Sequence, residues 1–91
     1  MMITVKRVVL DVLKPHQPDA LAFCEELAKL GPDYRVSLNV DEMDENTQTL
    51  QLEICGNAID LKPIEEAIAT MGASIHSVDQ VEVLNESTGE S

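Results

Sequence analysis

Four segments of the chain have the hydrophobic patterns of strands, and two segments between them repeat apolar residues at helical spacing. The strands are predicted over residues 3–13, 34–41, 49–54 and from about residue 74 onward, with clean alternation of apolar and polar residues in the middle two. The helical spacing predicts one helix that starts at Pro18 and stops before Gly31-Pro32. It predicts a second helix that is capped by Asp60 and ends at Gly72.

This order of elements, βαββαβ, is typical of a ferredoxin-like α/β sandwich. Right-handed crossovers and a central hairpin then give an antiparallel sheet in the order 4-1-3-2, with both helices on one face. A chain of 91 residues is long enough for one domain, which we place at residues 1–84. Residues 85–91 are polar and are expected to form a disordered tail.

The first predicted strand is apolar on both faces. Its core-facing set is Val8, Leu10 and Val12, and its other face carries Val5, Val9 and Leu13. A strand that is apolar on both faces is normally buried on both, so this pattern predicts a homo-oligomer whose interface includes the second set. The alternative is that long polar neighbours shield a few scattered apolar side chains.

The last predicted strand has an irregular pattern. If Ile75, Val81 and Val83 face the core in a regular strand, Asp79 faces it as well. A β-bulge near Ser77 or Val78 would restore the pattern, so we expect one there.

The charge balance excludes several classes of partner. The chain has 17 acidic and 6 basic residues, a formal net charge of -11, and Phe23 and Tyr34 as its only aromatic residues. Such a surface repels nucleic-acid phosphates and anionic membranes, and it lacks the aromatic residues on which RNA bases stack. The N-terminus has no signal-peptide pattern and no apolar run approaches a membrane span. We therefore expect a cytoplasmic protein that binds neither nucleic acid nor membrane.

The predicted topology gathers ionisable residues at one end of the sheet. Asp11, His16, His76 and Asp79 should approach one another there, with Asp41, Asp44 and Glu45 on the same edge. Carboxylate oxygens suit calcium, and histidine together with carboxylate suits zinc, so these four residues form a candidate site for a divalent cation. The alternative is that His16 orders the proline-containing loop and His76 bonds to the neighbouring strand.

Motifs of catalysis are missing from the sequence. Ser74 and Ser77 flank His76, but a nucleophile needs a base and an orienting group in three dimensions. Cys24 and Cys55 are far apart and form no C-x-x-C pattern, so no disulfide framework is expected.

Two segments resemble a known family. Val9–His16 and Gly72–Val81, together with the Gly56-Asn57 turn, are similar to the archaeal family called domain of unknown function 211. The resemblance covers nearly the whole chain apart from the tail. It implies a ferredoxin-like fold and assembly into larger homo-oligomers, and it implies no reaction.

These observations together favour a non-catalytic module that associates with itself and binds a divalent cation or small ligand in a regulatory role. A purely structural or partner-binding oligomer without a ligand is the alternative, and its protein partner is not specified by the sequence. A small enzyme is the third possibility.

Overall fold

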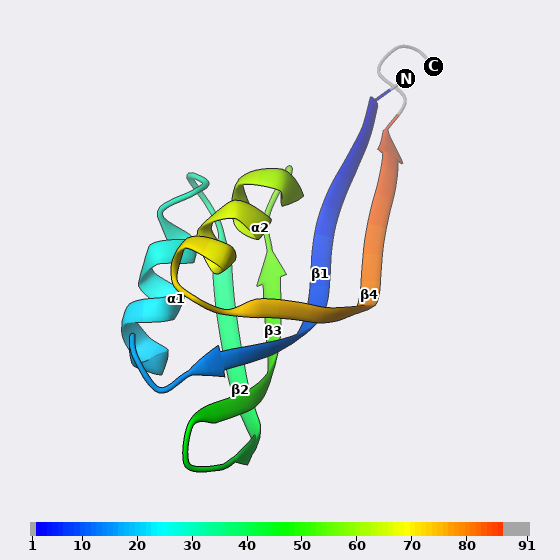
Figure 1. The fold of residues 1–91 in the computed structure, drawn as a ribbon. Coiled ribbons are helices and arrows are strands. Elements are labelled where there is room, and N and C mark those ends of the chain that lie inside the picture. Colours follow the sequence, from blue (N-terminus) through cyan, green and yellow to red (C-terminus); the bar gives the residue numbers. More distant parts are fainter. Residues whose placement is uncertain (1, 87–91) are drawn as a thin grey trace.

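The computed structural model describes residues 2–86 and has the βαββαβ order that the sequence predicts (Figure 1). The four strands form one antiparallel sheet in the order β2-β3-β1-β4, which confirms the predicted topology and the ferredoxin-like fold. The elements are β1 (Met2–Pro15), α1 (Ala20–Ala28), β2 (Arg35–Met43), β3 (Thr47–Cys55), α2 (Leu61–Thr70) and β4 (Ser74–Glu86).

The core lies between the two helices and one face of the sheet. Alternate residues of β1 and β3 face the helices because side chains alternate along a strand. The core cluster contains Val8, Leu10, Val12, Phe23, Leu27, Leu50, Leu52, Ile54, Ile59, Ile64, Ile68 and Ala73. Both helices therefore cover the same face, and the other face of the sheet is open. Within residues 2–86, neither helix is long and apolar enough to cross a membrane.

The two helix starts differ in detail from the prediction. Helix α1 begins at Ala20 instead of Pro18, because Asp19 is the N-cap and its carboxylate accepts a 2.8 Å hydrogen bond from the Ala22 amide. Asp60 does precede α2, but its side chain makes no capping hydrogen bond. Its amide donates instead to the Tyr34 hydroxyl at 2.8 Å.

The end of α2 at Gly72 is as predicted. Gly72 has a φ of 84°, a left-handed conformation that glycine adopts without steric cost. The turn is closed by hydrogen bonds from Gly72 N to Ala69 O and from Ala73 N to Ile68 O. This glycine therefore directs the chain from the helix back into the sheet as β4.

Strand β4 contains two bulges where one was predicted. Its pairing with β1 skips His76 and Asp79, the residues on either side of the predicted position at Ser77 or Val78. The bulges keep Ile75 and Val78 opposite Val12 and Leu10 on the helix-facing side. Asp79 is thereby released from facing the core and is exposed.

Strand β1 also contains a bulge, which the sequence analysis did not predict. The pairing skips Lys6, so Val5 pairs with Val83 while Arg7 pairs with Glu82. Val5 consequently packs against the core from the helix-facing side instead of lying on the open face with Val9.

The ends of β1 and β4 form a two-stranded arm, which we define as residues 2–7 and 82–86. Asn85 and Glu86 pair with Ile3 and Met2, so these two residues extend β4 and do not belong to a tail; residues 87–91 lie outside the described part. Strand β3 stops pairing at Arg7, and beyond it Gly56 N and Ile59 N donate to Lys6 O and Val5 O. The arm extends away from the helices and contributes to overall dimensions of 56 × 22 × 17 Å (Figure 1).

Lys14 is completely buried beneath α1. It follows Val12 on the helix-facing side of β1, and its Nζ donates to Pro15 O at 2.9 Å and to Gln48 Oε1 at 3.2 Å. The Nζ also lies 5.8 Å from the centroid of the Phe23 ring. Burial lowers the pKa of Lys14, because the charged ammonium loses its hydration.

We predict that Lys14→Met stabilises the protein at pH 7 by several degrees in melting temperature, because methionine fills the same space without a buried charge. The gain should shrink as the pH approaches 10.5. Since the folded pKa lies below that of the unfolded chain, the unfolded state binds more protons in this range and the wild-type protein gains stability as the pH rises. Circular dichroism melts from pH 7 to 10.5 measure both effects. Lys62→Met on the exposed surface of α2 is the control, and a lower melting temperature for Lys14→Met at pH 7 would contradict the prediction.

Candidate functional site

A hollow of about 260 Å³ lies on the open face of the sheet. It is lined by Asp11, Val12, Leu13, Thr49 and His76. Leu13 pairs with Thr49 across β1 and β3, so these two side chains share the open face. The hollow therefore combines an apolar wall with a carboxylate, a hydroxyl and an imidazole.

Asp11 and His76 reach this hollow from neighbouring strands. Asp11 pairs with Ser77, and His76 is the bulged residue next to that pair. A bulge redirects the side chain of the extra residue, which explains why His76 lines the open-face hollow while the adjacent Ile75 packs against the core. These are the two predicted site residues that the structure brings together.

His16 occupies a different place, at the tip of the β2–β3 hairpin. Its Nε2 lies 2.9 Å from Asp44 O, and because a carbonyl only accepts, the bond uses the Nε2–H of His16. This hydrogen bond ties the loop after β1 to the hairpin. It matches the alternative in which His16 orders the proline-containing loop.

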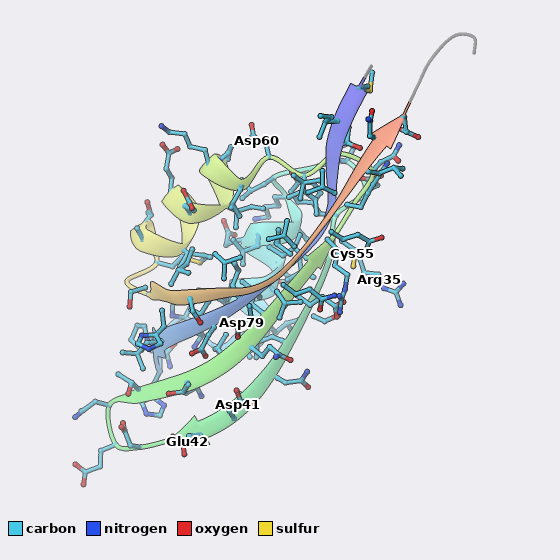
Figure 2. The ribbon with its side chains drawn as sticks, turned by 90° about the vertical axis from the view of Figure 1, so that its right-hand side faces the viewer. Arg35, Asp41, Glu42, Cys55, Asp60 and Asp79 are labelled. Carbon is cyan, nitrogen blue, oxygen red and sulfur yellow. The ribbon has the colours of Figure 1, made fainter. Side chains whose placement is uncertain are left out.

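Asp79 also has a local partner. The Ser77 hydroxyl donates to Asp79 Oδ1 at 2.7 Å, across the second bulge of β4. Figure 2 labels Asp79 on the bent part of β4, and Asp41 and Glu42 toward the hairpin end of β2. Within residues 2–86, no three histidine, cysteine, aspartate or glutamate side chains come together as a metal-holding group. The chain thus supplies two ligands at the hollow, one carboxylate and one imidazole, and a cation bound there would need further ligands from water or another molecule.

A second hollow, of about 320 Å³, lies at the hairpin tip and is lined by Glu42, Met43, Asp44, Thr47 and Thr49. Asp44 is already engaged there: its Oδ1 accepts hydrogen bonds from Asn46 N at 2.9 Å, Thr47 N at 2.8 Å and Thr47 Oγ1 at 3.1 Å. The bonds from the Thr47 and Asn46 amides lower the pKa of Asp44, because they stabilise its charged form. Asp44 therefore holds the turn together.

The three predicted interface residues do not form one exposed patch. Val9 is only 5% exposed, although it lies on the open face. Its pairing partner on β3 is Glu53, which forms an ion pair with Arg7. Val5 has moved to the helix-facing side through the bulge at Lys6, which leaves Leu13, at 42% exposure, as the exposed member of the set.

Exposed apolar residues concentrate instead on the helix-facing side of β4 and on the arm. Val78, Val81 and Val83 are 48%, 51% and 52% exposed, and they pair with Leu10, Val8 and Val5 on the helix-facing side. Ile3 continues this row on the arm, because it shares a face with Val5. We call Ile3, Val78, Val81 and Val83 the β4 stripe. Met2 and Leu84 are exposed on the opposite face of the arm.

Sequence reasoning missed Thr49 and Leu13 as lining residues of the hollow, and it missed the β4 stripe. The pairing of Leu13 with Thr49 follows from the register of the predicted strands, so that signal was available. The stripe had no comparable signal, because it depends on how far the helices extend over β4.

Comparisons with known proteins identify the family of this chain. A family model described as uncharacterized ArCR, domain of unknown function 211, matches residues 6–88. An uncharacterized protein of Methanocaldococcus jannaschii is 38% identical over 77 residues, which cover 85% of this chain and 79% of that protein. Neither description names a ligand, a reaction or a partner.

We predict that Asp44→Ala lowers the melting temperature, because the turn loses three hydrogen bonds to one carboxylate. The difference from wild type should be constant above about pH 5 and should shrink as the pH falls below 3.8. A folded pKa below the unfolded value means that the carboxylate contributes its stability above the unfolded pKa and loses it as the folded form is protonated. Asp41→Ala, at an exposed bulge of β2, is the matched control in the same thermal melts. An equal effect of both substitutions at every pH would count against this role of Asp44.

Proposed function

The chain belongs to the family of domain of unknown function 211, and from this premise we propose that it is a non-catalytic module that assembles into homo-oligomers. The observation that carries the proposal is the β4 stripe. A row of aliphatic side chains on the core-facing side of a sheet is normally covered, and in a single copy this row is half exposed.

The helices of the same copy do not cover the stripe. Helix α1 buries Phe23 and Leu27, and α2 buries Ile64 and Ile68, all within the core cluster over β1 and β3. The arm lies beyond both helices (Figure 1). Within residues 2–86 the stripe is uncovered, and we propose that a second copy of the chain covers it.

Burial of the stripe contributes to the free energy of association but cannot drive association alone. Full burial of a valine is worth about 1.5–3 kcal/mol, so completing the burial of three half-exposed valines is worth roughly 2–4 kcal/mol. Association costs about 4–15 kcal/mol in lost freedom of motion. The interface must consequently be larger than the three valines, and Ile3, Met2 and Leu84 of the arm supply further apolar surface.

We predict that Val81→Glu shifts the protein to the monomer, because the substitution places a charge at the centre of the stripe of an already acidic molecule. Sedimentation velocity at micromolar concentration measures the change. Leu21→Glu is the matched control, since Leu21 is 69% exposed on α1 and lies outside the stripe, so it should leave the oligomer intact. A wild-type protein that sediments as a monomer would contradict self-association itself. If the Val81→Glu variant still formed the wild-type oligomer, the interface would have to lie outside the stripe.

A second candidate function is the binding of a divalent cation, zinc or calcium, at the open-face hollow. The supporting observation is that Asp11 and His76, from two different strands, line the same hollow. An imidazole and a carboxylate together suit zinc, while calcium prefers oxygen ligands. Thr49 adds a hydroxyl at the same place. Such a site would add a regulatory ligand to the oligomeric module.

We expect zinc to raise the melting temperature with saturation at or below the millimolar range, and we expect Asp11→Asn and His76→Gln each to remove most of that rise. Calcium, titrated in parallel, distinguishes an oxygen-based site, which would depend on Asp11 and not on His76. Asp41→Asn is the control, because it removes one exposed carboxylate from outside the hollow. Unchanged melting curves with both cations would reject this candidate without affecting the proposal of self-association.

A further inference from the structure

Strand β4 lies at the edge of the sheet, and its two halves differ. Among residues 2–86 it pairs only with β1. Its first half contains the bulges at His76 and Asp79, which interrupt a regular edge and discourage pairing with another strand. Its second half, Gln80–Glu86, contains no bulge and no proline. This half therefore presents a regular row of backbone groups along its outer edge.

The outer part of the arm has no third strand beside it among residues 2–86, because the hydrogen bonds from Gly56 N and Ile59 N reach only Lys6 O and Val5 O. It has apolar side chains on both faces, with Ile3 and Val83 on the helix-facing side and Met2 and Leu84 on the other. Two-stranded ribbons are marginally stable in water, and three or more strands are needed for independent stability. A third strand beside β4 would supply what the arm lacks.

The distribution of charge identifies the occupant. The chain carries a net charge of -11, so two copies repel each other over most of their surfaces. The arm is less acidic than the rest of the chain, because Lys6 and Arg7 equal its two carboxylates, Glu82 and Glu86, in number, although Arg7 also pairs with Glu53 of β3. The arm is continuous with the β4 stripe, so a second copy of this chain meets less repulsion there than elsewhere on the surface.

We propose that the edge of β4 at Gln80–Glu86 pairs with a strand of a second copy, so that the hydrogen-bonded sheet continues from one molecule into the next. The inference rests on the proposed self-association and adds the mode of contact, which is backbone pairing at an edge in addition to side-chain burial. A strand added at this edge would bring its own side chains beside the β4 stripe and beside Leu84. It would thereby cover apolar surface on both faces at once.

Amide hydrogen exchange of the wild-type protein tests the pairing directly. Successive N–H groups of a strand point alternately toward its two sides, so about half of the amides of residues 80–86 bond to β1 and the rest point outward. In the dilute monomer the outward amides should exchange fast. At concentrations where sedimentation shows the oligomer, the same amides should slow by about tenfold or more. The amides at the exposed end of helix α1 serve as the internal control, and their exchange rates should not change with protein concentration.

An oligomer whose outward β4 amides still exchange fast would overturn edge pairing while leaving self-association standing. A monomer at every concentration would overturn both. Two proline variants, Glu82→Pro and Val83→Pro, give an independent test, because one of these neighbouring N–H groups points toward β1 and the other points outward. The variant that keeps the native circular dichroism spectrum is the one that has lost the outward N–H group, and it should fail to assemble. If this folded variant still assembled, the inference would be wrong.

Discussion

A mismatch of length between the helices and the β1–β4 pair governs this structure. Helices of 9 and 10 residues are about 15 Å long, whereas the 14-residue strand β1 extends over about 46 Å. The helix layer therefore buries the core-facing side of β1 from Val8 to Lys14 and leaves the N-terminal end of β1 and the C-terminal end of β4 uncovered. The arm and the elongated shape of the molecule follow from this difference (Figure 1). Val78 and Val81 of the β4 stripe are exposed although their partners Leu10 and Val8 are buried, because β4 lies at the edge of the sheet.

The three bulges adapt the long strands to that constraint. The bulge at Lys6 returns Val5 to the core side where the arm begins, and those at His76 and Asp79 bend β4 across the sheet. The same bulges decide the chemistry of the open face, because His76 then lines the same hollow as Asp11 and Asp79 lies beside Ser77. The bulges in β1 and β4 thus determine which apolar side chains are exposed and which ionisable side chains line the open face.

Basic and acidic residues are distributed unevenly between the arm and the body of the molecule. Of the six basic residues, Lys6 and Arg7 lie at the base of the arm, where they bind Asn57 and Glu53, and Lys14 is buried beneath α1. Most of the acidic excess consequently lies on the body of the molecule. Within residues 2–86 Lys14 hydrogen-bonds to a carbonyl and an amide oxygen and to no carboxylate, so its desolvation outweighs the attraction of the more distant Asp19. Burial also raises the pKa of the nearby Cys24 thiol, which favours its protonated form.

The sequence by itself determined the order of elements, the topology, the core face of β1 and β3 and the presence of irregularity in β4, because alternation and turn residues are local signals. It also placed Asp11 and His76 near each other, since the topology brings their strands together. The tertiary structure alone decided which residues of β1 and β4 are exposed. Val9 lies on the open face yet is buried, and Val81 lies on the core face yet is half exposed. Burial depends on what packs over a residue from elsewhere in the chain, and a one-dimensional pattern records only the face.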